Sequence, residues 1–219
     1  MATPRSAPDA SYVCCRTMDA RPKVVVIAGP NGAGKSTTAP AIVRQAFGVN
    51  EFVNADVIAR GLSEFAPETV AMTAGRIMLR RIKSLALQRA GFAFETTLAS
   101  RTFKPLLDAM QLDGYELHLI YLWLQTPELA LERVRERLKL GGHDVPEDVV
   151  RRRYERGLRN FFNIYRPIAD SWLMLDNSAG PTPKPIAWRN VGGPLQLVKS
   201  GPWERLRRNY EQDFISQDP

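Results

Sequence analysis

Near its start the sequence carries a run of glycines followed by a lysine and hydroxyl residues. Gly29, four further residues, and then Gly34, Lys35 and Ser36 match the Walker A pattern G-x-x-x-x-G-K-[ST], between a strand pattern and a helix pattern. Backbone N–H groups of such a loop surround phosphates, the lysine reaches the β- and γ-phosphates, and the hydroxyl holds Mg²⁺. A glycine-rich turn that only joins a strand to a helix is the alternative. We predict an ATP site with Mg²⁺ on Ser36, formed by Gly29, Pro30, Asn31, Gly32, Ala33, Gly34, Lys35, Ser36 and Thr37.

Carboxylates follow further strand patterns. Ligands of an open parallel sheet bind outside the carboxyl ends of its strands, so residues at those positions are candidates for acceptor binding. Asp56 ends EFVNAD and could accept the proton of an attacking hydroxyl, or it could cap a helix that begins at Val57. Glu95 ends FAFETT, where it and Thr96 are predicted to bind an acceptor. A water-mediated contact of Glu95 with Mg²⁺ and a salt bridge to a nearby arginine are the alternatives.

Positive charge concentrates in LERVRERLKLGGHDVPEDVVRRRYERGLRN, which predicts two helices joined at a Gly-Gly bend. Cations stabilise a phosphoryl group during its transfer, so a helical lid that closes over the nucleotide is predicted. Arg133 and Arg137 share a helix face, Arg152 and Arg153 come from the second helix, and His143 lies at the bend. The alternative is a solvated pair of salt-bridged helices. For the group as a whole, we predict at least one catalytic arginine.

Strand and helix patterns alternate along the chain. KVVVIAG is a short β-branched apolar run, typical of a strand buried on both faces of a parallel sheet. The alternation predicts an α/β fold with an open, mostly parallel sheet flanked by helices. Strands are predicted at 23–29, 51–56, 91–97, 115–126 and 171–177, and helices at 36–47, from 57, at 67–90, 103–112 and 126–140, and from 146.

Polar residues within these elements are mostly expected to be structural. Basic residues between the apolar positions of 67–90 are predicted to form a solvated helix face, among them Arg76, Arg80, Arg81 and Lys83. His118 lies inside a strand pattern and is predicted to be packed. Asp176, although it ends a strand pattern, is predicted to form a turn with the Asn and Ser that follow.

The ends of the chain differ from the middle. Residues 1–20 are predicted to be a disordered leader, and 21–219 a single domain. Within that domain we expect the helical lid at about 126–166 and a C-terminal attachment at about 181–219. Two apolar runs around Gly192-Gly193 predict a β-hairpin in this attachment, and PWERLRRNY predicts a final helical turn or two.

Composition indicates the surroundings. The chain has 219 residues with 30 Lys plus Arg against 23 Asp plus Glu, and its net charge of +7 favours anionic ligands such as nucleotides, nucleic acids or membrane surfaces. Its two adjacent cysteines cannot staple distant segments, and no apolar run approaches the roughly 20 residues of a membrane span. We therefore predict a cytoplasmic protein without membrane contact. Two histidines and two leader cysteines cannot build a zinc site, so no metal beyond Mg²⁺ is expected.

Three absent signatures narrow the function. The sequence contains no N/T-K-x-D segment of GTPases and no L-S-G-G-Q segment of transporter ATPases, and LHLIYLWLQT does not end in the acidic pair of motor ATPases. A phosphotransferase that moves the ATP γ-phosphate to a hydroxyl is the reading that remains. An ATPase or switch acting on a partner is the first alternative. A nucleic-acid-processing or binding protein is the second, and it is disfavoured because aromatic residues do not interleave with the arginines.

Four segments together, AGPNGAGKSTTAP, NADVIARGLS, FETTLAS and LGGHDVPEDVVRRRYERGLRNF, resemble the short bacterial zeta-toxin-like P-loop kinases over about Lys23 to Asn177. The resemblance implies a P-loop kinase fold, ATP and Mg²⁺ as cofactors, and UDP-N-acetylglucosamine or a related nucleotide sugar as the small-molecule acceptor. It implies an antitoxin protein as a partner. Asp56 is implied as the base, Glu95 as an acceptor ligand, and Arg133 as a ligand of the transferring phosphate, with a second lid group that Arg137, Arg152 or His143 could supply.

Overall fold

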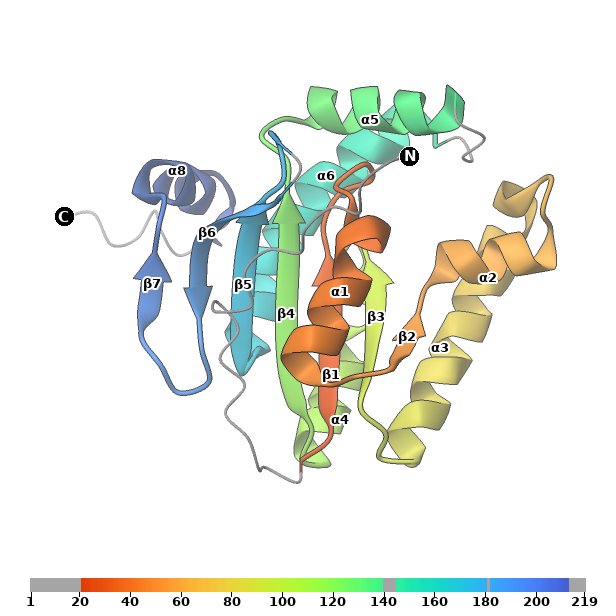
Figure 1. Cartoon of the computed structure of the whole chain (residues 1–219), viewed down its shortest axis with the longest axis horizontal. Coiled ribbons are helices and arrows are strands. Elements are labelled where there is room, and N and C mark those ends of the chain that lie inside the picture. The colour runs from red at the N-terminus through yellow and green to blue at the C-terminus, as the bar shows by residue number, and fades with distance from the viewer. Residues whose placement is uncertain (1–20, 140–144, 181, 213–219) are drawn as a thin grey trace.

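The computed structural model describes residues 21–139, 145–180 and 182–212, and it contains one seven-stranded sheet within these residues (Figure 1). The strands lie in the order β2-β3-β1-β4-β5-β6-β7. The first five are parallel, with β1 between β3 and β4, and the last two are antiparallel. Their bounds are β1 Lys23–Ala28, β2 Glu51–Val53, β3 Phe92–Thr96, β4 Glu116–Trp123, β5 Ser171–Asp176, β6 Lys184–Arg189 and β7 Leu195–Leu197. The predicted open, mostly parallel α/β sheet is confirmed.

Apolar strands form the centre of the core. All eight residues of β4 and five of the six in β1 are buried, because helices cover both faces of this part of the sheet. Figure 1 shows α1 on one face, α4 and α6 on the other, and α5 across the carboxyl ends of the strands. The helices are α1 Lys35–Phe47, α2 Ala55–Leu62, α3 Ala71–Leu87, α4 Lys104–Leu112, α5 Pro127–Lys139, α6 Glu147–Asn160, α7 Arg166–Ile168 and α8 Ser200–Tyr210.

The predicted C-terminal hairpin is present and extends the main sheet. Strand β6 pairs with β5 and β7 pairs with β6, both antiparallel, around the turn at Gly192. Helix α8 spans eleven residues, which is longer than the predicted turn or two. It is held by Trp203, which is fully buried and stacks on Trp172 of β5 with ring centroids 5.1 Å apart. Strands β6 and β7 of the tail thus extend one edge of the sheet, and α8 packs against β5 through Trp203.

Several element bounds differ from the predicted ones. Strand β2 ends at Val53, three residues before the predicted end at Asp56, because Asn54 already caps α2. The predicted helix at 67–90 begins as a 3₁₀ turn, Pro67–Val70, before α3. A π-helical turn at Phe161–Tyr165, which the sequence did not predict, separates α6 from α7.

Some predictions fall outside the described residues. The leader at 1–20, the Gly-Gly bend at 141–142 and His143 lie there. In the part of the chain that the structure describes, no helix is both long enough and apolar enough to cross a membrane.

Candidate functional site

The predicted phosphate loop joins β1 to α1 at the carboxyl edge of the sheet. Gly34 adopts φ 77° as the N-cap of α1, a conformation that side-chain-bearing residues rarely adopt. Gly29 allows a close approach, because a Cβ at this position would lie 2.3 Å from the carbonyl oxygen of Leu122 in β4. The Nδ2 of Asn177, just after β5, donates to the carbonyl of Ala33 at 2.8 Å. Asn177 therefore supports the loop from the neighbouring strand, a role that no sequence motif indicated.

Lys35 is the first residue of α1, and its side chain is 7 % exposed. Its Nζ donates to the carbonyls of Gly29 at 3.0 Å and Pro30 at 2.9 Å, and it lies 3.7 Å from Oε1 of Glu95. Burial lowers the pKa of Lys35 most, with Arg137 and Arg153 acting in the same direction and the carboxylates of Glu95 and Asp56 opposing it. These groups converge on one ammonium, so the P-loop, two strand-end acids and two arginines form one electrostatic unit.

The two predicted acidic residues are linked through Asn54. Its Nδ2 donates to Oε2 of Glu95 at 2.8 Å, and its Oδ1 accepts from the backbone N–H of Asp56 at 2.8 Å. Asn54, not Asp56, is the N-cap of α2, so the alternative role of Asp56 as the cap is wrong. The ion-pair partner of Glu95 within the described residues is Lys35 rather than an arginine, which also corrects the alternative weighed for Glu95.

Ser36 and Glu95 provide oxygen atoms suited to a magnesium ion. Ser36 would contact the ion directly, and Glu95 would orient its water ligands. The hydroxyl of Ser36 donates to Oε2 of Glu95 at 2.8 Å. Hydroxyl and carboxylate oxygens suit Mg²⁺, which usually keeps several waters and relies on substrate phosphates for the rest of its shell. In the described ranges no group of three His, Cys, Asp or Glu could hold a metal ion. The residues therefore fit a metal that arrives with a nucleotide and do not form a dedicated protein cage.

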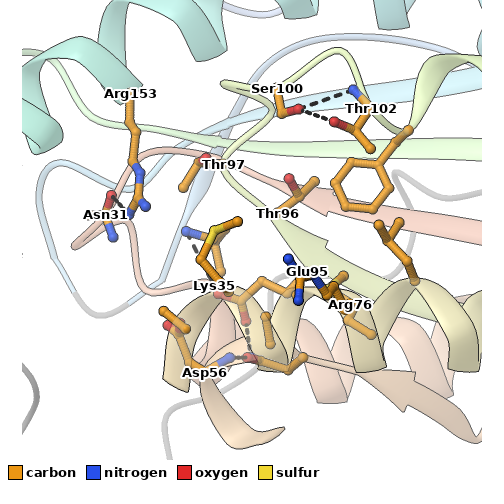
Figure 2. A pocket seen from close by; sticks show the side chains of 18 residues that line it. Asn31, Lys35, Asp56, Arg76, Glu95, Thr96, Thr97, Ser100, Thr102 and Arg153 are labelled. Atoms are coloured by element: carbon orange, nitrogen blue, oxygen red, sulfur yellow. Dashed lines mark hydrogen bonds and ion pairs between the residues drawn. The ribbon is translucent and has the colours of Figure 1, made fainter. Parts of the chain in front are cut away.

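A cavity of about 480 Å³ opens beside this cluster (Figure 2). It extends from the P-loop past the end of β3 to α3, and Asp56, Glu95 and Thr96 all line it, as predicted for acceptor-binding residues. Its other lining residues are Asn31, Lys35, Asn54, Ala55, Ala71, Met72, Gly75, Arg76, Met78, Leu79, Thr97, Ser100, Thr102, Phe103 and Arg153. A smaller cavity of about 250 Å³, between α2 and the start of α6, shares Ala55, Asp56, Ala71 and Arg153 with it. Asp56 thus lies where the two cavities meet.

The lid arginines separate into two groups. Arg153 lines both cavities, and its Nη1 lies 3.5 Å from Oδ1 of Asn31 in the P-loop. Burial lowers its pKa, and Asp56 opposes that shift. Arg137 has two buried nitrogens, Nε and Nη2, that find no hydrogen-bond partner among the residues that the structure describes. Buried guanidinium nitrogens normally have partners, so this group is available to an anionic ligand.

The other two lid arginines make protein contacts. Arg133 donates through Nη2 to the carbonyl of Ser178 at 3.0 Å, and its Cβ borders Gly32 of the P-loop. Arg152, one of the predicted catalytic residues, is half exposed and forms an i,i+4 ion pair with Asp148 at 3.4 Å. The structure does not bring Arg152 to the site, because on a helix its side chain points about 100° away from that of Arg153. Arg153 takes the place predicted for Arg152.

Helix α6 also holds the loop that forms the cavity wall after β3. Asn160 donates to the carbonyl of Leu98 at 2.6 Å, and Tyr165 donates to that of Ser100 at 2.7 Å. Leu98 is fully buried with φ 56°, a strained backbone conformation for leucine. Gly157 packs so closely that a Cβ would lie 2.5 Å from the carbonyl oxygen of Thr97. The helix that carries Arg153 is therefore bound to the wall of the larger cavity.

The remaining polar predictions concern residues outside the cavity. Asp176 forms the predicted turn, accepting from the N–H of Ser178 at 3.0 Å and pairing with Lys199 at 3.0 Å. His118 is packed, as predicted: it is 3 % exposed, lies against Phe47, and its Nδ1 is 2.7 Å from Oγ of Ser171.

A mostly parallel sheet flanked by helices, with a P-loop between its first strand and first helix, defines a P-loop kinase type of fold. The zeta toxin family model matches residues 10–169, and the chain belongs to the zeta toxin family.

Two solved structures and one curated protein are similar to the chain. A crystal structure of AvrRxo1-ORF1:-ORF2 with ATP aligns with a TM-score of 0.66 at 16 % identity over 85 % of this chain, which spans 63 % of that one. The PezAT toxin–antitoxin system of Streptococcus pneumoniae aligns with a TM-score of 0.55 at 18 % identity, over 78 % of this chain and 80 % of that one. An uncharacterized protein of Haemophilus influenzae is 30 % identical over 135 residues, which are 60 % of this chain and 92 % of that one.

Proposed function

We propose that the protein is an ATP-dependent kinase that transfers the γ-phosphate to a hydroxyl of a small molecule. The observation that supports this most is the position of Asp56, which borders two cavities and contributes to the charge around Lys35 of the P-loop. P-loops occur in proteins with many different reactions. Transfer to an acceptor hydroxyl additionally requires a carboxylate that can take the proton, next to a cavity large enough for a small organic molecule. Membership of the zeta toxin family agrees with this proposal.

The residues divide the reaction between them. Lys35 and the P-loop amides bind the phosphates, and Mg²⁺ held with Ser36 would neutralise charge on the phosphate oxygens. Asp56 accepts the proton of the acceptor hydroxyl as that oxygen attacks. Arg137 and Arg153 stabilise the negative charge of the transferring phosphoryl group, while Glu95, fixed by Asn54 and Ser36, orients the acceptor and the waters of the metal.

A nucleotide sugar such as UDP-N-acetylglucosamine is the proposed acceptor. The cavity of about 480 Å³ has the size of small-molecule sites in general and combines apolar walls with hydroxyl groups. A protein antitoxin is the proposed partner, because the similar PezAT structure is that of a toxin–antitoxin system.

The test is phosphotransfer with ATP, Mg²⁺ and a panel of nucleotide sugars, followed by mass spectrometry for a product heavier by one phosphate. The Asp56→Asn variant should lose at least about 100-fold in turnover, since general base catalysis contributes about that much or more, and should bind ATP as well as the wild type in calorimetry. Asp148→Asn, at an exposed carboxylate that pairs with Arg152, is the matched control and should keep full activity. ATP hydrolysis that proceeds equally fast without any acceptor would show a nucleotide-driven switch instead.

A further inference from the structure

Arg76 on α3 is exposed, as the predicted solvated helix face requires, and it also lines the cavity of about 480 Å³ (Figure 2). The other members of that face behave as predicted. Arg81 pairs with Glu51 at 2.9 Å in an exposed ion pair, and Arg80 and Lys83 are exposed. Arg76 is thus the member of the basic face whose side chain borders the cavity, one helical turn before Arg80.

The cationic side chains that line the cavity come from different helices. Lys35 and Arg153 come from the P-loop side, where Lys35 lies near Glu95 and Arg153 reaches Asn31. Arg76 comes from α3, outside the P-loop side, and among the residues that the structure describes no carboxylate lies within ion-pair distance of it. The cavity is also lined by apolar and hydroxyl-bearing residues of α3 and of 96–103, and by the carboxylates of Asp56 and Glu95; the apolar and hydroxyl-bearing residues are Met72, Met78, Leu79, Phe103, Thr96, Thr97, Ser100 and Thr102.

We propose that Arg76 binds an anionic group of the acceptor and so determines acceptor specificity. The guanidinium offers five N–H donors suited to phosphate or carboxylate oxygens, and it borders the cavity from a solvent-exposed position on α3. The acceptor class that fits has a hydroxyl for Asp56 and a phosphate, diphosphate or carboxylate for Arg76. This inference rests on the proposed kinase function and adds the group that selects charged over neutral acceptors.

The experiment compares Arg76→Gln with Arg80→Gln, which removes an equal charge from the same helix outside the cavity. With UDP-N-acetylglucosamine as acceptor, Arg76→Gln should raise the acceptor KM about 10- to 100-fold, the loss expected for a charge-assisted hydrogen bond, with kcat and the KM for ATP nearly unchanged. Arg76→Lys should recover part of the loss, and Arg80→Gln should behave as the wild type. High salt should raise the acceptor KM of the wild type and not that of Arg76→Gln.

A second measurement keeps this inference distinct from the kinase proposal. Calorimetric titration with UDP-N-acetylglucosamine measures binding whether or not phosphate is transferred, and Arg76→Gln should bind at least about 10-fold more weakly than Arg80→Gln. If the wild type transfers phosphate and both variants bind equally, the role of Arg76 is refuted while the kinase proposal stands. The inference is also overturned if the wild type phosphorylates neutral N-acetylglucosamine as efficiently as the nucleotide sugar. It is overturned as well if the wild type binds neither compound. Thermal unfolding of each variant checks that the fold is retained.

Discussion

At the scale of single residues, Asn54 is the side chain through which the acidic groups of the site are kept in place. It is 6 % exposed, and it caps α2 with one end of its amide while holding Glu95 with the other. An aspartate at this position would keep the cap but would set two carboxylates against each other, because only the amide supplies a donor. The asparagine therefore lets the start of α2 and the end of β3 share one hydrogen-bonding group.

Arg153 and Arg152 offer a matched pair of substitutions, because they are neighbours in sequence with opposite surroundings. Arg153→Ala should lower kcat by about 10³-fold, the order of effect seen for arginines that stabilise a transferring phosphoryl group. Arg152→Ala should change kcat less than about twofold, since it removes only an exposed i,i+4 ion pair. Steady-state kinetics with ATP and the acceptor, followed by formation of the phosphorylated product, check both, and equal losses in the two variants would contradict the assignment.

The sequence predicted the P-loop fully, because its glycines, lysine and hydroxyl serve one chemical purpose at fixed spacing. It also predicted the placement of Glu95 and Asp56, since parallel strands end at a common edge. The sequence alone could not decide between Arg152 and Arg153. Three consecutive arginines point to different sides of a helix, and only tertiary contacts determine which side faces the site. Arg76 is exposed as predicted, but its position beside the cavity depends on where α3 packs, which the helix pattern alone does not give. The amides of Asn54 and Asn177 carry no motif at all.

At the scale of elements, the second helix of the predicted lid, α6, is attached to the rest of the domain by several contacts. Helix α6 contacts the loop after β3 through Gly157, Asn160 and, by way of the π-turn, Tyr165. The same helix brings Arg153 to the P-loop. If the proposed roles hold, we expect a change in the cavity wall to alter the position of the arginine, so that acceptor binding and phosphate stabilisation are coupled through this segment.

Gly157→Ala tests this coupling. The added methyl would meet the backbone carbonyl of Thr97 at 2.5 Å, so α6 must shift, and we expect a net destabilisation of about 1–3 kcal/mol together with a raised acceptor KM. Gly61→Ala in α2 is the control, because nothing lies within 4 Å of its Cβ, and it should be neutral or stabilise by up to about 1 kcal/mol. Denaturant unfolding and acceptor kinetics measure the two effects. A Gly157→Ala enzyme with unchanged stability and KM would show that α6 moves freely.

At the scale of the whole molecule, the candidate site and a buried titratable residue lie at opposite ends of the sheet's strands. The site occupies the carboxyl ends of the parallel strands, whereas His118 is buried near the start of β4, opposite Ser171 and beside Phe47. Burial, reinforced by the positive charges of Lys23 and Arg21, lowers the pKa of His118 to about 3. The histidine is therefore neutral in the folded protein at any pH at which the protein would work.

The lowered pKa of His118 makes stability depend on pH. An unfolded histidine titrates near 6.5, so the stabilisation is complete above that pH and is lost as the pH falls from about 6.5 towards 3. At pH 5 the loss should be about 2 kcal/mol relative to pH 8. His118→Gln cannot be protonated, so the difference in unfolding free energy between wild type and variant should shrink by that amount over this interval. A difference that is the same at both pH values would contradict the shift.

The π-turn that follows α6 makes the acceptor wall sensitive to chain length. A π-helix joins residues five apart and so accommodates one residue more than an α-helix would over the same rise. Losing that residue would let α6 continue regularly and turn everything beyond it by about 100°, which would take the hydroxyl of Tyr165 away from Ser100. A single codon gained or lost at this point could therefore alter which compounds the protein accepts while leaving every catalytic side chain intact.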